Sequence, residues 1–367
     1  MRKPLGVYIH IPFCARKCNY CDFLSGPATA DIQRKYVEML LLEIEAYSML
    51  LESRKISTIF FGGGTPSILQ GEAILQVMEK LRVLGNISEN AEISIEANPG
   101  TVTEKKLQLW KRAGINRISF GLQSADNEEL QRLGRIHTWE AFEENYYLAR
   151  KCGFENINVD LMSALPGQTV DTWRKTMERV TALNPEHISA YSLIIEEGTP
   201  FYETYADHPE LLPSEEEERE MYYETKTFFA SRGYERYEIS NYARTGYECR
   251  HNLSYWERGD YLGLGLGAAS LLGNVRKSNQ TELAEYLKGN FAGKEEILSD
   301  INAMEEYFFL GLRKMKGVDW TPYQEQYKKI IEKLVDEGLL EKDAGYIRLT
   351  ELGIDVSNYV LSEFLVE

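Results

Sequence analysis

The chain has 367 residues, of which 43% are hydrophobic and 27% are charged, the balance of a folded protein with more than one small core. Its 41 lysines and arginines stand against 57 aspartates and glutamates, so the formal net charge is −16. A surface this acidic repels phosphate backbones and anionic lipid, which argues against nucleic acid and membrane surfaces as partners.

Targeting and membrane signals are missing from the sequence. No apolar run reaches the roughly 18 residues that a membrane span needs. The N-terminus starts with basic residues, but its apolar run is short and no small-residue cleavage site follows. Five cysteines, three of them within eight residues, fit a metal site better than a disulfide framework. We therefore expect a cytoplasmic protein with no membrane span.

The first half of the chain alternates between strand-like and helix-like segments. Short β-branched or aromatic runs predict strands at 6–12, 58–61, 92–96, 117–121, 156–161 and 187–193. Apolar residues three and four apart predict helices at 36–51, 73–84, 104–113, 141–150 and 172–183. This α/β alternation predicts a parallel sheet, and six units are too few for a closed eight-stranded barrel. We predict a partial, open (β/α)6 barrel over 1–207, with ligands at the carboxyl ends of its strands.

The second half is expected to hold two smaller regions. Residues 208–220 contain two prolines and then an acidic run, which we interpret as a solvated helix face. The region 208–299, rich in tyrosine and glycine, is predicted to be a smaller α+β accessory region on the ligand side. From 300 to 367 the pattern predicts a C-terminal winged-helix-like domain, with an amphipathic helix at 323–339, a strand at 345–349 and a helix at 351–364. Its many acidic residues argue against DNA binding.

Three cysteines carry the chemistry of the chain. Cys14, Cys18 and Cys21 are spaced CxxxCxxC directly after the first predicted strand. Three thiolates can ligate three irons of a [4Fe–4S] cluster and leave the fourth iron without a protein ligand. That iron can chelate the amino and carboxylate groups of S-adenosylmethionine (SAM), and one-electron reduction then cleaves the sulfonium to a 5′-deoxyadenosyl radical. The alternatives are unligated thiols or a structural zinc with His10 as fourth ligand, although the pleat of the predicted strand should aim His10 away.

The two remaining cysteines lack a metal-like spacing. Cysteine is among the most buried residue types, so Cys152 is expected in the core. Cys249 lies two residues before His251, and a role near that histidine stays open.

Polar and glycine residues follow several of the predicted strands. The sequence FGGGTP, at 61–66, comes after the second strand, where glycines let the backbone pair with the charged groups of a bound amino acid. Glu96, Gln123 and Asp160 each interrupt an apolar strand near its end. Because an unpaired buried polar group costs about 1–3 kcal/mol, a cluster of them at one sheet edge favours a ligand site. For any single residue, a plain turn or a helix cap is the alternative.

Seven motifs together identify a family resemblance that covers essentially the whole chain. They are YIHIPFCARKCNYCDF, FGGGTP, SIEANPG, FGLQS, LGRIHT, DLMSALPGQT and RHNLSYW. The chain resembles the HemW family of radical-SAM heme chaperones, kin to the oxygen-independent coproporphyrinogen III dehydrogenase HemN. The resemblance implies Cys14, Cys18 and Cys21 as iron ligands, and SAM contacts from Tyr8, Tyr20, Gly63, Gly64, Thr65, Glu96, Gln123, Arg135 and Asp160. Tyr20 stands where the dehydrogenase has phenylalanine, so a ring or backbone contact is expected there.

Two departures separate the chain from the dehydrogenase. That enzyme has a further cysteine two residues after the third, where this chain has Phe23. It also has a longer N-terminal extension that helps to form its substrate pocket, whereas 13 residues precede Cys14 here. Both departures favour the chaperone.

The segment RHNLSYW, residues 250–256, matches the HNxxYW motif of the chain's relatives. Imidazole is a common axial ligand of heme iron, and Tyr255 and Trp256 can pack against a porphyrin plane. The alternative is a hydrogen-bonded histidine at the end of an aromatic core strand. The resemblance favours a heme role for His251, with the following YLGLGLGAAS lining the same region.

The sequence therefore predicts a heme chaperone that binds heme and transfers it to an acceptor apoprotein. Its cofactors would be a [4Fe–4S] cluster, SAM and heme, and its partners heme and the apoprotein, with no nucleic acid. Gating of transfer through a homodimer is a further expectation. The alternative is radical-SAM oxidative decarboxylation of coproporphyrinogen III, and a third hypothesis is a radical-SAM enzyme with another substrate.

Overall fold

The computed structural model describes residues 3–365, and one curved sheet organises most of them. Within these residues the sheet has twelve strands in the order β12-β11-β10-β9-β1-β2-β3-β4-β5-β6-β8-β7. The six strands of the predicted barrel stand side by side and parallel: β1 (Leu5–Ile11), β2 (Lys55–Gly63), β3 (Asn86–Ala97), β4 (Arg117–Gln123), β5 (Ile157–Ser163) and β6 (His187–Ser192). The partial barrel is confirmed.

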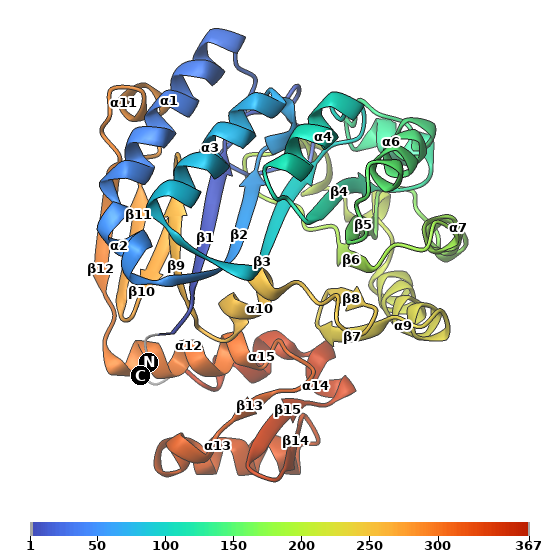
Figure 1. Ribbon diagram of the computed structural model, residues 1–367. Helices are drawn as coiled ribbons and strands as arrows, with labels where there is room; N and C mark the ends of the chain where they lie inside the picture. Colours follow the sequence, from blue (N-terminus) through green and yellow to red (C-terminus); the bar gives the residue numbers. More distant parts are fainter. Residues whose placement is uncertain (1–2, 366–367) are drawn as a thin grey trace.

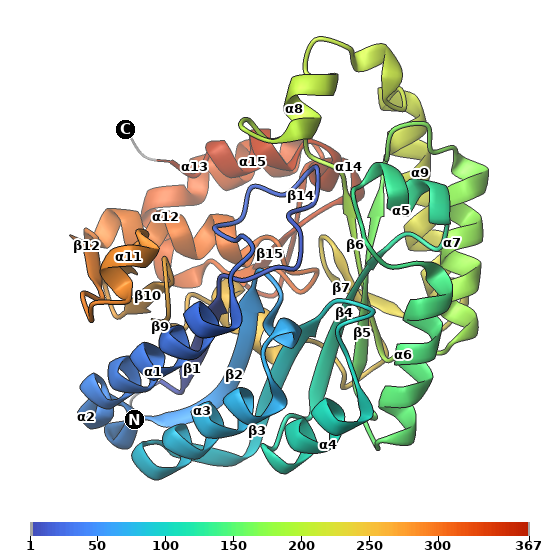
Figure 2. The same cartoon turned by 90° about the horizontal axis from the view of Figure 1, so that it is seen from above.

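Helices cover the outer, convex side of this sheet, as Figures 1 and 2 show. They are α1 (Ala30–Ala46), α2 (Ser48–Ser53), α3 (Gly71–Leu84), α4 (Glu104–Arg112), α5 (Asn127–Arg132), α6 (Trp139–Lys151) and α7 (Val170–Ala182), with a 3-10 turn η1 (Pro66–Ile68) after β2. Threonines at 103, 138 and 169 cap α4, α6 and α7 by accepting a backbone N–H in the first turn. In the part of the chain that the structure describes, we find no helix with the length and apolar character to span a membrane.

The pleat of the strands separates an apolar side from a polar side. Along β4, Ile118, Phe120 and Leu122 are fully buried and belong to the main hydrophobic core beneath the helices. The alternate residues Arg117 and Ser119 turn to the concave side, where they line a cavity. The concave face of β4 is therefore polar, unlike the apolar face beneath the helices.

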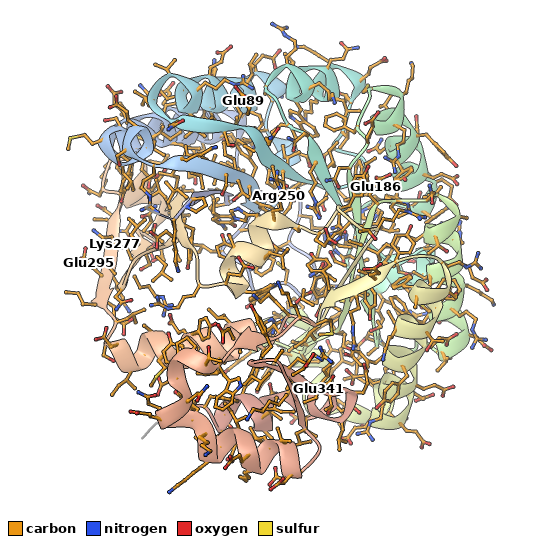
Figure 3. All side chains as sticks on the ribbon, turned by 60° about the horizontal axis from the view of Figure 1, so that its bottom comes forward. Glu89, Glu186, Arg250, Lys277, Glu295 and Glu341 are labelled. Atoms are coloured by element: carbon orange, nitrogen blue, oxygen red, sulfur yellow. The ribbon has the colours of Figure 1, made fainter. Side chains whose placement is uncertain are left out.

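Segment 208–299 continues the same sheet instead of packing on it as a separate layer. After α8 (Pro200–Tyr205), the 3-10 turn η2 (Pro209–Leu211) and α9 (Glu215–Ser231), the strands β7 (Glu235–Glu238) and β8 (Asn241–Ala243) extend the β6 edge. The strands β9 (Asp260–Leu264), β10 (Ala269–Leu272), β11 (Val275–Asn279) and β12 (Ala292–Ile297) extend the β1 edge, with α11 (Leu283–Tyr286) before β12. Helix α10 (Arg250–Trp256) connects the two edges and passes beneath the barrel strands (Figures 1 and 3).

A buried carboxyl fastens the second edge to the first helix. Glu43 on α1 accepts hydrogen bonds from the Gly265 N–H at 2.8 Å, from Asn279 Nδ2 at 2.6 Å and from the Tyr286 hydroxyl at 2.6 Å. Burial raises the pKa of Glu43, and these three donors oppose that shift. Gly265, Asn279 and Tyr286 are thereby held against α1.

The C-terminal residues form a smaller domain with a core of its own, as expected. It contains α12 (Asp300–Gly311), β13 (Val318–Asp319), the 3-10 turn η3 (Thr321–Tyr323), α13 (Gln324–Asp336), β14 (Leu340–Asp343), β15 (Tyr346–Leu349), α14 (Glu351–Asp355) and α15 (Ser357–Ser362). The single helix expected at 351–364 is wrong, because Val356 leaves helical geometry (φ −114°, ψ 32°) and separates α14 from α15. Salt bridges from Lys226 and Arg236 to Glu351 join this domain to α9 and β7.

Trp173 tests how α7 is packed against α9. Its side chain is fully buried, and its Nε1 donates to Thr225 Oγ1 at 2.8 Å. Trp173→Ala leaves a cavity and removes the hydrogen bond to Thr225, so we expect a loss of about 3–5 kcal/mol in unfolding free energy, measured by urea titration with far-UV circular dichroism. Val83→Ala on α3, where the side chain is 81% exposed, should change stability by less than about 0.5 kcal/mol. A loss below about 1 kcal/mol for Trp173→Ala would contradict this packing.

Candidate functional site

The three cysteines lie on a closed loop that follows β1. The loop is pinned at its base, since the Cys14 N–H donates to the Gly26 carbonyl and the Gly26 N–H to the Pro12 carbonyl, both at 3.0 Å. Within it, the Cys21 N–H donates to the Cys18 carbonyl at 3.3 Å. Figure 2 looks down on the loop, drawn in dark blue, inside the curve of the sheet. The cysteines thus stand at the carboxyl ends of the strands, where the sequence predicts a ligand site.

The glycine motif at the end of β2 packs directly against this loop. A Cβ atom on Gly64 would lie 2.8 Å from the Phe13 carbonyl oxygen and 2.9 Å from Cys14 Sγ, so only glycine fits. Thr65 donates its hydroxyl to Cys14 Sγ at 3.4 Å, and the Gly64 N–H donates to the Ile11 carbonyl at 2.9 Å. FGGGTP is therefore more than a turn, because it supports the first cysteine.

A cavity of about 140 Å³ gathers the cysteines and most of the SAM residues that the resemblance implies. It is lined by Cys14, Cys18 and Cys21 together with Tyr20, Gly63, Gly64, Thr65, Glu96, Gln123, Arg135 and Asp160. Tyr8 lines the adjoining larger cavity instead. Among residues 3–365, no group of three His, Cys, Asp or Glu side chains converges closely enough for a single metal ion. Ligands of a cubane cluster each bind a different iron, so they surround a wider space.

Two carboxyls that line the cavity, Glu96 and Asp160, give it its electrostatic character. Glu96 accepts the Gly63 N–H at 3.0 Å, and burial followed by the nearby Asp160 raises the pKa of Glu96 to about 8. Asp160 accepts from Ser119 Oγ at 3.1 Å and from Asn158 Nδ2 at 2.7 Å, and burial raises its pKa as well. Two carboxyls facing one cavity repel each other when ionised, so a cationic ligand group such as an ammonium or sulfonium suits them.

The chemistry of the donor set also fits a cluster. Burial raises the pKa of the Cys21 thiol, so its thiolate needs a positive partner such as iron. Arg135 Nη1 donates to Cys18 Sγ at 3.4 Å. Gln123, at the end of β4, has a φ of 76°, a left-handed conformation that is uncommon outside glycine and concentrated at functional sites.

A larger cavity of about 510 Å³, the interior cavity, adjoins the cysteine side of the barrel. It extends from Tyr20, Cys21 and Phe23 at one end to His251 and Tyr255 on α10 at the other. It shares Glu96, Gln123 and Asp160 with the smaller cavity. Its size is that of a small-molecule or cofactor site. The cysteine loop and the HNxxYW segment therefore face one continuous space.

His251 lies on a helix, so the strand that the alternative placed it on is wrong, but the histidine is buried and hydrogen-bonded as that alternative held. Its side chain is 1% exposed, with Nδ1 2.8 Å from Thr58 Oγ1 and Nε2 2.9 Å from the Tyr255 hydroxyl. The ring also stacks on Phe60, with 5.1 Å between centroids. Both ring nitrogens are in use, so coordination of an iron by His251 requires one hydrogen bond to open. Of the two motif aromatics, Tyr255 lines the interior cavity, whereas Trp256 packs its ring under Arg313 and lines a neighbouring cavity.

The sequence also led to expectations for His10, Cys152 and Cys249. His10 is not aimed away from the cysteine loop, because its Nε2 contacts the Leu24 carbonyl of that loop at 3.1 Å and its Nδ1 contacts the Tyr8 hydroxyl at 3.0 Å. Cys249 is fully buried at the start of α10, with Sγ 3.6 Å from Glu92 Oε1. Cys152, at the end of α6, packs against the main core. Among the described residues, neither of these two cysteines lines the two cavities.

Sequence reasoning missed a set of polar side chains inside the barrel. They line the interior cavity and come from three adjacent strands: Arg117, Ser119, Asn158, Ser189 and Tyr191. The signal was present in the alternation of RISFGLQ and NVDL, where every second residue is polar or glycine. A strand buried on both faces would have aliphatic residues there.

Comparisons with known proteins agree with this geometry. Residues 8–180 match the model of the radical SAM superfamily, and residues 298–356 match the HemN C-terminal domain. The chain is 36% identical to the heme chaperone HemW of Bacillus subtilis and 34% identical to that of Escherichia coli, over 99% of this chain and 99% of each relative. It is also 30% identical to the bovine radical S-adenosyl methionine domain-containing protein 1, mitochondrial, over 98% of this chain and 87% of the relative.

Among solved structures, the chain is similar to coproporphyrinogen III oxidase (HemN) from Escherichia coli, described as a radical SAM enzyme. The TM-score is 0.84 at 26% sequence identity, covering 100% of this chain and 91% of the other. The similarity therefore extends through the barrel, the continuation of its sheet and the C-terminal domain.

The burial of His251 leads to a prediction about how the stability of the protein depends on pH. Burial, followed by the charge of Arg117, lowers its pKa from 6.5 to about 3. Between these values the unfolded chain binds the extra proton, so stability falls as pH falls through this window. We expect His251→Gln to reduce the slope of unfolding free energy against pH by up to about 1.4 kcal/mol per unit, measured by urea titrations across the window.

The control for this measurement is Val83→Ala, since Val83 is 81% exposed and carries no titratable group, so the slope should be unchanged. Equal slopes in the wild type and in His251→Gln would show that His251 is not held neutral in the folded protein.

Proposed function

Because the chain belongs to the family of the heme chaperone HemW, we propose that it binds heme and passes it to an acceptor protein. The observation that carries the proposal is the interior cavity, which joins the cysteine loop to the HNxxYW helix. A chaperone needs a site that holds its cargo without consuming it, and a polar-walled, aromatic-lined cavity beside a cofactor loop is such a site.

The cofactors of the radical-SAM domain are a [4Fe–4S] cluster and SAM. Cys14, Cys18 and Cys21 hold the cluster, which when bound supplies an electron and one open coordination site. The Gly63 and Gly64 backbone lets a ligand approach closely beside these cysteines. Glu96 and Asp160 would hold the cationic groups of SAM, while Tyr20, Thr65, Gln123 and Arg135 line the same cavity. Tyr8 would reach SAM from the adjoining interior cavity.

Heme would lie in the interior cavity with its plane against aromatic rings. Tyr8, Phe60 and Tyr255 supply these rings, and His251 lies among them. We propose that His251 serves as the axial ligand through Nε2, releasing the Tyr255 hydroxyl that it now contacts at 2.9 Å. Its neutral state favours coordination, because only unprotonated imidazole ligates iron.

The second candidate is the oxidative decarboxylation carried out by coproporphyrinogen dehydrogenase. The structural similarity to HemN over the whole chain favours it. Against it, Phe23 occupies the position of the dehydrogenase's extra cysteine and lies 61% exposed where the two cavities meet. An exposed ring cannot replace a thiol in any proton or hydrogen transfer, so we propose that the chain does not turn over this porphyrinogen.

The proposal also covers the cellular compartment and the oligomeric state of the protein. All five cysteines are unpaired, and cluster assembly needs reduced thiols, so we propose that the protein acts in the cytoplasm. A homodimer that gates transfer stays a prediction.

Cluster assembly depends on three thiols. We expect protein reconstituted anaerobically to contain about four irons and four sulfides per chain, and Cys14→Ala, Cys18→Ala and Cys21→Ala each to lose the intact cluster. Cys152→Ala is the matched control and should retain it. Iron and acid-labile sulfide analysis with visible and EPR spectroscopy measures the outcome. An intact cluster in Cys18→Ala, or stoichiometric zinc without sulfide, would contradict the assignment.

Heme binding and porphyrinogen turnover separate the two candidates. We expect the purified protein to bind about one heme per chain, and the reduced protein with cluster and SAM to form no protoporphyrinogen IX from coproporphyrinogen III. His251→Ala should weaken heme binding or change the absorption spectrum, because the axial nitrogen is lost. Tyr255→Phe removes only the competing hydroxyl, so the axial spectrum should persist.

Product formation that requires Cys14, Cys18 and Cys21 would overturn the chaperone and support the dehydrogenase. Unchanged heme affinity and spectrum in His251→Ala would remove His251 as the ligand and leave the chaperone proposal in place.

A further inference from the structure

Arg117 is a buried cation that faces the interior cavity. It is the first residue of β4, paired in register with Ser94 of β3. The pleat sends its side chain to the concave side, on the same face as Ser119. Only 2% of the residue is exposed, although its side chain is among the largest buried in the chain.

Within residues 3–365 the guanidinium of Arg117 has no hydrogen bond or ion pair, and the charges that act on it do so through space. Its Nε is buried without a hydrogen bond. By contrast, the buried Arg54 donates to Asp260 at 2.8 Å and to the Lys3 carbonyl, and the half-buried Arg135 donates to Asn98 at 2.8 Å and to Cys18. A buried charge without hydrogen bonds is costly, so the site is incomplete as it stands.

Four groups act on Arg117 through space, Cys249, Glu92, Tyr237 and Asp160, and the two carboxylates among them accept hydrogen bonds from other residues. Glu92 interacts electrostatically with Arg117 but accepts hydrogen bonds from the backbone N–H groups of Arg250 at 2.9 Å and His251 at 3.1 Å. Asp160 also interacts with Arg117 through space, while its oxygens accept from Ser119 and Asn158. Neither carboxylate forms a hydrogen bond with the guanidinium group. The planar N–H donors of that group are arranged to bind a carboxylate through two parallel hydrogen bonds.

The surroundings indicate the kind of ligand that would complete the site. The hydroxyl and amide groups of Ser119, Asn158 and Ser189 lie along the same wall of the cavity, and the rings of Phe60 and Tyr255 lie along another. The cavity therefore suits a molecule with a flat apolar body and an anionic side group. A carboxylate beside Arg117 would satisfy the unpaired donors and cancel the buried charge.

We propose that Arg117 binds a carboxylate of the ligand in the interior cavity, and that this carboxylate is a propionate of the tetrapyrrole. The inference rests on the proposed function, since it assigns the tetrapyrrole an orientation. One propionate points toward the start of β4, and the ring system lies against the aromatic wall between Arg117 and the cysteine loop.

Esterified tetrapyrroles test this contact. Heme and heme dimethyl ester share the same ring and iron, but only heme carries free carboxylates. We expect the wild type to bind heme at least about tenfold more tightly than the diester, as for loss of a charge-assisted hydrogen bond. Metal-free protoporphyrin IX and its dimethyl ester should show the same preference, because the contact does not involve iron.

A double-mutant cycle combines substitution of Arg117 with esterification of the ligand's carboxylates. Arg117→Gln should lower heme affinity by about tenfold or more and remove the preference for the free acid, whereas Arg117→Lys keeps the charge and should retain part of it. Arg150→Gln is the matched control, because Arg150 pairs with Glu186 at 2.8 Å and does not line the interior cavity. Absorption and fluorescence titrations measure all four proteins.

Equal affinity of the wild type for acid and ester, or an undiminished preference in Arg117→Gln, would overturn the inference and leave heme binding intact. If Arg117→Gln does not fold, the ester comparison in the wild type and in Arg117→Lys decides the question. A wild type that binds none of the four tetrapyrroles would contradict the proposed function, and the inference with it.

Discussion

The pleat of the parallel strands is the constraint on which the site depends. Along β4 it sends Ile118, Phe120 and Leu122 into the core under the helices, and it turns Arg117 and Ser119 to the concave side. The same alternation brings Asn158 and Asp160 of β5 and Ser189 of β6 to the concave side. Because the sheet remains open, these side chains are not packed into layers as in a closed barrel, and a ligand-sized cavity remains between them.

Two connections close this cavity at opposite ends. At the carboxyl ends of the strands, Gly64 allows the FGGGTP turn to lie against Phe13 and Cys14, so the cysteine loop stays inside the curve of the sheet. At the lower end, α10 brings His251 against Thr58 of β2, while Glu92 of β3 accepts the N–H groups at the start of the helix. A molecule in the interior cavity would contact both ends, which links the cofactor side to the HNxxYW helix.

Local signals in the sequence were sufficient for the partial barrel and the cysteine loop. Strand and helix periods, and the spacing of Cys14, Cys18 and Cys21, report on neighbours along the chain. Such local signals do not predict which strands pair when they are far apart in the sequence. Strand β9 pairs with β1 across some 250 residues of chain. The contacts of Glu43 with Asn279 and Tyr286 join segments at a similar separation in the sequence. The helical state of RHNLSYW was also missed, because its aromatic residues favour strands while Glu92, remote in sequence, caps the helix.

The central claim is that heme occupies the interior cavity between the cysteine loop and α10. A crystal structure of the heme-loaded protein, grown anaerobically, tests it most directly. The account predicts porphyrin density within the curve of the sheet, with the ring against Phe60 and Tyr255 and one propionate at the Arg117 guanidinium. Porphyrin density on the outer surface, or in the separate cavity beside Trp256 and Arg276, would contradict it.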